Sequence, residues 1–479
     1  MGTRFDFVVL GSGPAGRRAA VQAAKLGKTV LVVDNRARVG GVSVHTGTIP
    51  SKTLRETALN LSGWRERGFY GRAYRVKHQI DGGDLSARLG KTLTHEIEVL
   101  EHQFARNGVQ TMVGQARFVS PNQIAVTTPA GEQVVEAARV LIAVGTEPHR
   151  PSTIPFDERT VLDSDEFIQN PSVPRSLTVV GGGVIGLEYA TIMSALDVPV
   201  TLIEPRARLL EFIDAEVVDH LVHQLRDQGM RLLLGTELER IELGSGGPVC
   251  RLTDGRSVRS DMVLYAAGRQ GATAGLDLAA CGLETDARGR IAVDPLSYQT
   301  AVRHIYAAGD VIGWPSLAST SMEQGRAAAC HAFDQPLPSG AEHFPIGIYA
   351  VPELSSAGLS EEAARAKGLA YECGIARFRE TSRGHIMGVG CGVLKLLFDL
   401  PSRRLLGVHI IGEGATELVH IGQAVIALGG TIDYFIDHSF NYPTLAEAYK
   451  IAALDAWNRL RQNQGQPAKL RAVNSKQVS

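Results

Sequence analysis

The sequence predicts an α/β fold in which one strand–helix–strand unit occurs twice, followed by a C-terminal region of mixed strands and helices. Two observations carry this prediction. Glycine-rich turns of the GxGxxG type stand about 170 residues apart, and each unit ends in a similar strand, VLIAVG or VLYAAG. At 479 residues the chain exceeds what one hydrophobic core usually supports, so we expect about three domains.

The first unit begins with an apolar strand at residues 5–10 and continues with Gly11, Gly13 and Gly16. In such a turn the first glycine permits the tight bend, the second lets the backbone approach a pyrophosphate, and the third lets helix and strand pack closely. The helix N-terminus then offers unpaired N–H groups to the diphosphate. The strand TVLVVD follows, and Asp34 at its tip can accept hydrogen bonds from a ribose diol. This pattern predicts a Rossmann-like dinucleotide site.

The second unit repeats the pattern over residues 176–204. Its turn contains three glycines in the same positions, Gly181, Gly183 and Gly186. The acid at the next strand tip, Glu204, favours NAD(H), because an acid there binds the ribose 2'-OH and repels a 2'-phosphate. Arg206 and Arg208 follow, and guanidinium groups beside the ribose can pair with a 2'-phosphate. Alternatively, both arginines are solvated or contact the diphosphate. We expect NAD(H) to bind here and NADP(H) to be accepted, with the preference between them open.

Composition and charge exclude several classes of function. A content of 44% apolar and 21% charged residues is typical of a water-soluble globular protein. The formal net charge of -1 gives no electrostatic argument for binding nucleic acid or an anionic membrane. There is no apolar run long enough to span a bilayer and no export signal, so we expect a cytoplasmic protein. The five cysteines are scattered without CxxC spacing, so we expect neither a disulfide scaffold nor a metal site.

Three stretches of the chain resemble the lipoamide dehydrogenase and glutathione reductase family. Residues 40–52, GGVSVHTGTIPSK, resemble its GGTCxxxGCIPSK segment, and residues 300–310, TAVRHIYAAGD, resemble its second FAD motif. The third stretch, FNYPTLAEAY, lies near the C-terminus, and the resemblance runs from about residue 4 to 461. It implies FAD in the first nucleotide site, NAD(H) or NADP(H) in the second, and a C-terminal α+β dimerisation domain that forms a homodimer or a higher homo-oligomer.

The resemblance also implies which residues contact the cofactors. Asp310 corresponds to the acid that binds the ribityl chain of FAD. Together with the glycines that end the closing strands, the predicted contacts are Gly40, Gly41, Ser43, Thr48, Lys52, Gly145, Gly268, Gly309 and Asp310.

The departures from the family pattern are the most informative part of the resemblance. Where the family has its two redox cysteines, this chain has Ser43 and Thr48, which cannot form a thiolate. Where the partner subunit of the family supplies a histidine base, this chain has Tyr442. The joint loss indicates that thiol chemistry has been abandoned. Lys52 is retained, and the resemblance implies that it lies near flavin N5, pairs with Glu188 and stabilises the hydride-accepting state. We predict Lys52 and Glu188 as the catalytic pair.

The predicted domain boundaries follow the two units and a proline-rich linker, TEPHRPSTIPF. We expect an FAD-binding domain at 1–150, an NAD(P)-binding domain at 151–275, the rest of the FAD-binding domain at 276–343, the dimerisation domain at 344–461 and a disordered tail at 462–479. Within the first domain we expect helices at about 51–67 and 85–106.

These features predict an enzyme that passes hydride between NADPH and NAD through FAD in a ping-pong reaction, without a redox disulfide. Two alternatives remain open. One is a diaphorase that reduces a quinone, a dye or oxygen, because nothing in the sequence selects the acceptor. The other is a structural subunit that has kept the fold but lost turnover, although the intact Lys52, Glu188 and Asp310 argue against it.

Overall fold

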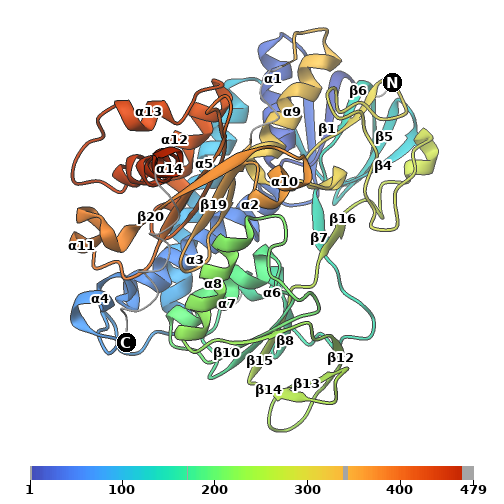
Figure 1. The fold of residues 1–479 in the computed structure, drawn as a ribbon. Coiled ribbons are helices and arrows are strands. Elements are labelled where there is room, and N and C mark those ends of the chain that lie inside the picture. The colour runs from blue at the N-terminus through green and yellow to red at the C-terminus, as the bar shows by residue number, and fades with distance from the viewer. Residues whose placement is uncertain (1–2, 170, 338–343, 466–479) are drawn as a thin grey trace. The chain divides into compact units, whose positions relative to one another are not determined.

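The structure is a computed structural model that describes residues 3–169, 171–337 and 344–465. The chain divides into two compact units. Figure 1 draws and labels the helices and strands, coloured along the chain. The first unit holds the described residues of 1–64, 75–210 and 225–342, and the second holds those of 65–74, 211–224 and 343–479. Among the described residues, no helix combines the length and the apolar character needed to cross a membrane.

Within the described residues, the first glycine-rich turn belongs to a seven-stranded sheet of order β3-β2-β1-β6-β5-β4, with β17 also paired to β6. Its strands are β1 (Arg4–Leu10), β2 (Val30–Asp34), β3 (Gln110–Val113), β4 (Gln115–Ser120), β5 (Gln123–Thr128), β6 (Gly131–Ile142) and β17 (Ile305–Ala307). Strands β3, β2, β1, β6 and β17 run parallel, whereas β4, β5 and the start of β6 are antiparallel.

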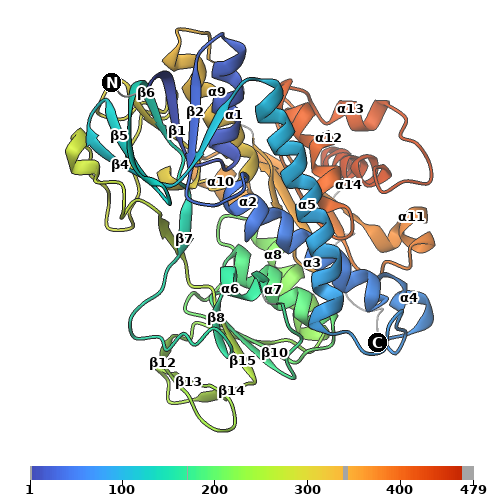
Figure 2. The same cartoon turned by 180° about the vertical axis from the view of Figure 1, so that it is seen from behind.

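Both faces of this parallel sheet are covered, as alternate residues of β1 show. Phe7 and Val9 are fully buried under α1 (Pro14–Lys25) and α9 (Ala318–Ala332), two helices that pack together (Figure 2). Val8 belongs to a separate core on the other face. Burial on both sides explains the continuous apolar run that the sequence has here.

A set of helices separates β2 from β3 in the chain. They are α2 (Gly41–His45), α3 (Thr48–Leu61), the short η1 (Trp64–Glu66), α4 (Arg67–Tyr70) and α5 (Gly82–Arg106). A capping box formed by Asp81 and Asp84 starts α5. The predicted helix at 51–67 is wrong at its C-terminal end, because Ser62 and Gly63 follow Leu61 and Gly63 adopts φ +64°, a left-handed conformation that ends helices.

The second glycine-rich turn belongs to a five-stranded parallel sheet of order β11-β10-β9-β15-β8. The elements of this region are β8 (Val161–Asp163), α6 (Ser164–Gln169), β9 (Leu177–Val180), α7 (Val184–Ala195), β10 (Val200–Glu204), β11 (Arg231–Leu234) and β15 (Met262–Tyr265). Helix α8 (Ala215–Asp227) lies between β10 and β11 in the chain, and its residues up to 224 belong to the second unit. A small antiparallel sheet packs on it, formed by β12 (Leu238–Glu242), β13 (Val249–Leu252) and β14 (Ser257–Arg259). Two antiparallel strands, β7 (Thr146–Pro148) and β16 (Arg269–Gly271), carry the chain into and out of this region.

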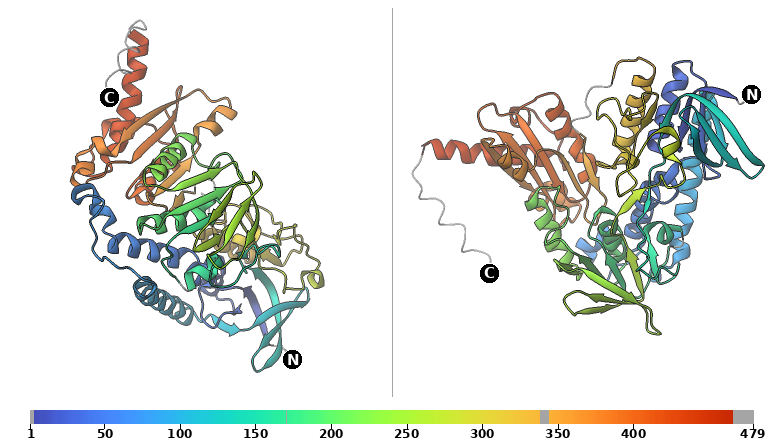
Figure 3. Two further views of the ribbon diagram at one scale, coloured as in Figure 1. Left: turned by 90° about the horizontal axis from the view of Figure 1, so that it is seen from below. Right: turned by 90° about the vertical axis from the view of Figure 1, so that its right-hand side faces the viewer.

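The C-terminal region forms an antiparallel sheet of order β18-β19-β22-β21-β20. Its elements are β18 (Ile346–Ile348), β19 (Leu354–Gly358), α10 (Glu361–Ala366), β20 (Tyr371–Arg377), α11 (Ser382–Ile386), β21 (Val393–Asp399), β22 (Leu405–Ile411), α12 (Ala415–Ala427), α13 (Asp433–Asp437) and α14 (Glu447–Gly465). Residues of α12 and α14 share one apolar core with this sheet. The last turns of α14 extend beyond the sheet (Figure 3).

Helix α14 continues to Gly465, so the predicted start of the disordered tail at residue 462 is too early. The rest of that predicted tail, residues 466–479, lies outside the described residues.

Candidate functional site

The first glycine-rich turn leaves no room for side chains. Gly11 adopts φ +100°, and a Cβ atom there would overlap the carbonyl oxygen of Ala143 in the neighbouring strand β6. A Cβ atom on Gly16 would overlap the carbonyl oxygen of Gly11, so helix α1 packs directly on the turn. Gly13 faces open space, apart from one approach of 4.0 Å to Gly41. The tight bend at Gly11 and the close packing at Gly16 are as the sequence predicted, and the approach of a pyrophosphate at Gly13 stays a prediction.

The N-termini of α1 and α7 are both uncapped. Gly13 and Gly183 stand at the two N-cap positions, and no side-chain cap bond is present at either one in the described part of the chain. First-turn N–H groups without a protein acceptor, at the positive end of a helix dipole, suit a diphosphate. Both turns therefore fit a dinucleotide.

Asp34 at the tip of β2 fixes the shape of the first turn. Its Oδ2 atom accepts hydrogen bonds from the Ser12 backbone N–H at 2.7 Å and the Ser12 hydroxyl at 2.5 Å. Its Oδ1 atom accepts the N–H of Arg36 at 2.9 Å. The Ser12 hydroxyl also accepts the N–H of Gly40 at 2.9 Å, and so it joins the turn to the next predicted segment. Sequence reasoning missed Ser12.

The segment that resembles the redox loop lies against the first turn. Gly40 and Gly41 adopt φ +125° and +59°, and a Cβ atom on Gly41 would stand 2.7 Å from the Cα atom of Gly13. Ser43 lies on α2, where its hydroxyl donates to the carbonyl oxygen of Gly40 at 3.0 Å. Thr48 is the first residue of α3. All of these except Gly40 line one cleft within the first unit.

The same cleft collects most of the residues predicted to contact FAD. The predicted residues on its wall are Gly11, Gly13, Asp34, Gly41, Ser43, Thr48, Gly145, Gly309 and Asp310. Gly145 has φ +68° with no heavy atom near its missing Cβ, and Gly309 has φ +85°. Burial raises the pKa of Asp310 above its usual value, against the opposing effects of Arg269 and the Ser321 hydroxyl.

Lys52 and Glu188 form an ion pair. The Lys52 Nζ atom lies 2.6 Å from Glu188 Oε2, and it joins the first turn of α3 to α7, although 136 residues separate the two in the chain. The Glu188 side chain is 5% exposed and that of Lys52 26%. The buried carboxylate of Glu188 fixes the position of the partly exposed Lys52 ammonium.

The second glycine-rich turn has the same backbone design. Gly181 adopts φ +106°, and a Cβ atom on Gly186 would overlap the carbonyl oxygen of Gly181. Nothing lies within 4 Å of a Cβ atom placed on Gly183. Gly268, at the end of the closing strand, has φ +127° and also faces open space.

Glu204 at the tip of β10 is almost fully buried and closely held. Its Oε2 atom accepts the N–H of Gly182 at 2.6 Å, and its Oε1 atom accepts the backbone N–H and the side-chain Nε–H of Arg206 at 3.0 and 2.7 Å. Burial acts to raise the pKa of Glu204, but the hydrogen bonds from Arg206 and Gly182 outweigh it, so the pKa lies below its usual value. Glu204 is therefore ionised at neutral pH, and Arg206 is bound to it.

Sequence reasoning also missed a polar junction between the two nucleotide regions. Asp165 on α6 accepts a hydrogen bond from the Thr46 hydroxyl at 3.0 Å and one from Arg269 at 3.1 Å. Arg269 on β16 also donates from Nε to the Thr146 hydroxyl on β7 at 2.9 Å. The junction ties the loop between α2 and α3 to the connecting strands. Its one sequence signal is that Arg269 directly follows the predicted Gly268.

Comparisons with known proteins identify the family. A family model described as pyridine nucleotide-disulphide oxidoreductase matches residues 5–325, and the dimerisation-domain model of that family matches residues 344–453. The chain belongs to the pyridine nucleotide-disulphide oxidoreductase family. The resemblance seen in the sequence is thereby confirmed, together with the predicted fold class of two Rossmann-like nucleotide-binding domains and a C-terminal dimerisation domain.

Within this family, several relatives carry one printed name. A soluble pyridine nucleotide transhydrogenase of Mycobacterium tuberculosis is 49% identical, over 95% of this chain and 98% of that protein. A soluble pyridine nucleotide transhydrogenase of Marinomonas is 41% identical, over 95% and 99%.

Solved structures of the family agree with the fold. LpdA from Mycobacterium tuberculosis covers 96% of this chain with a TM-score of 0.85 at 26% identity. The HOCl-induced flavoprotein disulfide reductase RclA from Escherichia coli covers 94% with a TM-score of 0.84, also at 26% identity. In both comparisons the match covers 99% of the chain of the solved structure.

Proposed function

We propose that this member of the family passes hydride between NADPH and NAD through FAD, and that no thiol takes part. The cleft of the first unit would hold FAD, with the N-terminus of α1 at its diphosphate and Asp310 at its ribityl chain. The nicotinamide nucleotides bind in turn at the second glycine-rich turn. Bound there, FAD would supply a hydride acceptor and donor for the nicotinamide nucleotides. The name shared by relatives that are 40–49% identical over nearly their whole length supports this assignment.

One observation carries the absence of thiol chemistry. The loop that resembles the redox loop of the family supplies Ser43 and Thr48 to the cleft wall, and no described residue on that wall is a cysteine. Burial raises the pKa of the Cys281 and Cys330 thiols, so both are poor nucleophiles where they stand. A disulfide beside the flavin would compete for the hydride, and a thiol-free wall avoids this competition.

In this proposal Lys52 and Glu188 act at the flavin end of the site. The ammonium of Lys52 provides a positive charge that stabilises a ring system as it accepts hydride. This electrostatic stabilisation is strongest where water is excluded. Glu188 is buried and holds that ammonium at 2.6 Å, so its task is to position the charge. The cofactor contacts predicted at Gly145, Gly268 and Gly309 are backbone contacts, because none of these residues has a side chain.

Glu204 and Arg206 together suit a site that must accept both nucleotides. Glu204 offers carboxylate oxygens to a ribose diol, as NAD(H) requires. Arg206 is bound to Glu204 but is 45% exposed, so its guanidinium can turn towards a 2'-phosphate. One acid and one arginine therefore serve the two ribose forms by exchanging partners. Arg208 follows on the same segment and adds a second positive charge for the phosphate.

The decisive experiment follows hydride transfer without oxygen. Addition of NADPH to the purified yellow protein should bleach the flavin absorbance, and NAD added afterwards should restore it. Recovery with a quinone or a dye but not with NAD would support the diaphorase alternative instead. A protein whose absorbance never changes would support the structural-subunit alternative. Pretreatment with N-ethylmaleimide should leave the rate unchanged, whereas a thiol-dependent enzyme would lose activity.

The assembly and location remain part of the proposal. The match to the dimerisation-domain model supports a homo-oligomer, and we propose a homodimer. The word soluble in the relatives' name supports a cytoplasmic location. We also propose the domain boundaries at 150, 275 and 343. The expectation that nucleic acid is not a partner stays a prediction.

A further inference from the structure

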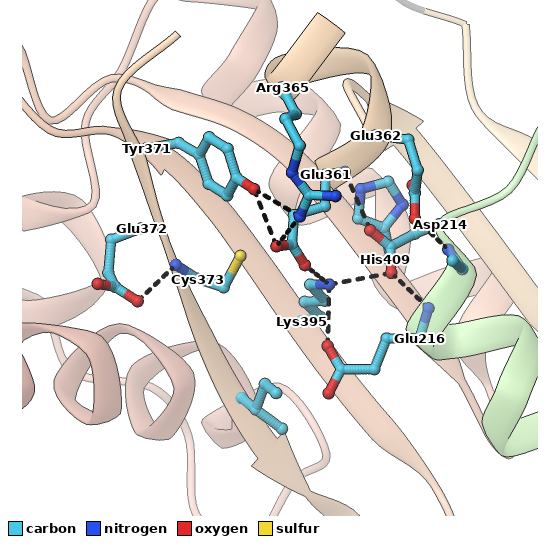
Figure 4. Close-up of polar contacts among 12 residues, drawn as sticks. Asp214, Glu216, Glu361, Glu362, Arg365, Tyr371, Glu372, Cys373, Lys395 and His409 are labelled. Atoms are coloured by element: carbon cyan, nitrogen blue, oxygen red, sulfur yellow. Dashed lines mark hydrogen bonds and ion pairs between the residues drawn. The ribbon is translucent and has the colours of Figure 1, made fainter. Parts of the chain in front are cut away.

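The buried lysine of the second unit is neutralised by acids of the same unit. Lys395 on β21 is 1% exposed, and its Nζ atom lies 3.0 Å from Asp214, 2.9 Å from Glu216 and 2.7 Å from Glu361 (Figure 4). A buried ammonium is costly unless carboxylates compensate it, so the three acids account for its presence. None of these four residues lines the cleft of the first unit, which has a polar cluster of its own.

Four residues of the first unit form a hydrogen-bonded cluster that we call the Asp165 junction: Thr46, Thr146, Asp165 and Arg269. Asp165 accepts the Thr46 hydroxyl at Oδ2, at 3.0 Å, and the Arg269 Nη1–H at Oδ1, at 3.1 Å. The other two nitrogens of Arg269 donate to the Thr146 hydroxyl at 2.9 Å and to its carbonyl oxygen at 2.8 Å. The side chains of Asp165 and Arg269 are 18% and 17% exposed, so water competes little for these bonds.

The junction borders the cleft proposed for FAD. Asp165 and Thr146 are themselves on the cleft wall, and Thr46 stands in the chain between the wall residues Ser43 and Thr48. Thr46 is the C-cap residue of α2, and α3 begins at Thr48. The hydrogen bond from Thr46 to Asp165 therefore fixes the loop between α2 and α3 at the point where it meets the cleft.

Asp165 comes from the other nucleotide region. It lies in the first turn of α6, directly after β8, and β8 belongs to the sheet that carries the second glycine-rich turn. The connecting strands β7 and β16 pair over only three residues each, and a two-stranded ribbon is weak by itself. Arg269 on β16 bonds both β7 and α6, so it holds this ribbon against the second parallel sheet.

A second contact joins the same two regions. The ion pair of Lys52 and Glu188 connects α3 to α7, at 2.6 Å. Thr46 and Lys52 lie on opposite sides of Thr48, so the start of α3 is held at two points. One contact allows two bodies to rotate about it, whereas two contacts at different points do not. The Asp165 junction and the ion pair together fix the cleft wall relative to the sheet of the second turn.

We propose that Asp165 is a positioning residue for hydride transfer: it holds the cleft wall at Thr46 against the second nucleotide region, and so aligns the two nucleotides that these sites would hold. The inference rests on the proposed function of the two sites. A displacement of about 1 Å at reacting groups can cost about 100-fold in rate. Nucleotide affinity should not change, because the second glycine-rich turn and Glu204 keep all their contacts when the junction is broken.

The test compares two substitutions of Thr46. T46V removes the hydroxyl but keeps the shape of the side chain, and it should slow flavin reduction by NADPH about tenfold while the Kd for NADPH changes less than twofold. T46S keeps the hydroxyl and should keep the wild-type rate. E166Q is the matched control, because Glu166 follows Asp165 on α6 and is 19% exposed but pairs with Arg150 outside the junction. A folded, FAD-loaded T46V protein with the wild-type rate would overturn the inference.

Two further measurements separate this inference from the proposed function. Stopped-flow reduction follows the first half-reaction alone, so a wild-type protein that NADPH reduces but NAD does not reoxidise would defeat only the proposed function. Hydrogen exchange needs no turnover, and it should become faster at residues 45–48 in T46V but not in T46S or E166Q. Unchanged exchange in T46V would contradict the inference.

A substitution at the other end of the hydrogen bond covers the case in which T46V does not fold. D165N removes the charge that holds Arg269 and weakens the acceptor of the Thr46 hydroxyl, so it should slow flavin reduction in the same direction. An unchanged rate in D165N would likewise overturn the role of the junction.

Discussion

The two glycine-rich turns have the same hydrogen-bond pattern. In each, an acid at the tip of the next strand accepts the N–H of the residue after the first glycine, Ser12 at 2.7 Å or Gly182 at 2.6 Å. In each, the other carboxylate oxygen accepts an arginine N–H two residues further on, at 2.9 and 3.0 Å. The strand–turn–helix–strand motif is therefore duplicated in its polar contacts as well as in its strands.

The differences between the turns match two kinds of occupant. In the first, the Ser12 hydroxyl closes the turn by bonding both Asp34 and the N–H of Gly40. In the second, a glycine takes the place of Ser12, and the exposed side chain of Arg206 binds the acid instead. An internally closed turn suits a resident cofactor, whereas an exposed charged side chain suits ligands that enter and leave. The acid is therefore common to both turns, and the residues beside it differ.

The largest effect should come from filling the third glycine of each turn. G16V should yield colourless or unfolded protein, because a Cβ atom there overlaps the Gly11 carbonyl oxygen in the turn where we propose that FAD binds. G186V should keep its flavin but lose reduction by NADPH by more than about 100-fold. Absorbance spectra and anaerobic reduction measure both. G90A, at an exposed helix position with open space, is the control. Loss of FAD in both variants would show that the two sites are not separable.

Loss of the ion pair between Lys52 and Glu188 should have the next largest effect. E188Q and K52M should each slow flavin reduction about 100-fold, because both displace or remove one fixed positive charge. The double variant should be no slower than the single ones, since the two residues act as one unit. Stopped-flow reduction by NADPH provides the rates. K77M, which removes a more exposed ion pair with Asp84, should behave as wild type. Additive losses would contradict the paired role.

Removal of the second turn's arginine tests the difference between the turns directly. R206A should raise KM for NADPH roughly tenfold, equivalent to about 1.4 kcal/mol, and leave KM for NADH within a factor of about two. Initial rates with each nucleotide measure the change. R175A removes an exposed ion pair with Asp261 in the same region and should change neither constant. An equal loss for both nucleotides would mean that Arg206 contacts the shared diphosphate.

A smaller effect is expected from the hydroxyl found only in the first turn. S12A leaves the N–H of Gly40 without its acceptor, so it should destabilise the protein by about 1–2 kcal/mol and speed the release of FAD. Thermal unfolding and flavin release report both quantities. S86A removes an exposed hydroxyl on α5 and serves as the control. The variant would contradict our reading of the closed turn if it kept wild-type stability and retained FAD as tightly.

The smallest effect concerns pH. The pKa of Glu204 in the folded protein is below its usual 4.5, so its stabilising contribution is present above pH 4.5 and lost as the pH falls through the folded pKa. E204Q should therefore be less stable than wild type near pH 6, and the difference should shrink below pH 4.5. Urea unfolding at several pH values measures this. A difference independent of pH would mean that the carboxylate charge is not what stabilises the turn.

The local patterns predicted the parts of the fold that depend on short stretches of sequence. Both strand–turn–helix–strand units, the strand at 305–307 and the start of α5 near Leu85 were accessible, because glycine spacing and apolar periodicity act within a few residues. The helix end at Leu61 was missed although Gly63 signals it, since the prediction followed the apolar pattern past a glycine. Boundaries depend on single residues, whereas elements depend on many.

The long-range contacts could not be predicted in the same way. Lys52 and Glu188 were paired only through a family resemblance, as 136 residues separate them. Asp165 and Lys395 lie 119 and 181 residues from partners that no local pattern connects to them, Thr46 and Asp214. A single acid or lysine in a sequence has the same appearance whether it is solvated or buried against an opposite charge. The tertiary fold alone decides between these states.

The position of β17 has a consequence for biosynthesis. This strand pairs in parallel with β6, yet about 160 residues, including the whole second parallel sheet, are translated between them. All strands of the second parallel sheet therefore leave the ribosome before β17, the last strand of the seven-stranded sheet. We expect the second parallel sheet to fold first on the nascent chain. Until residue 307 emerges, β6 lacks its partner strand at Val140, Leu141 and Ile142, and an unpaired strand edge is a site at which a nascent chain can associate wrongly.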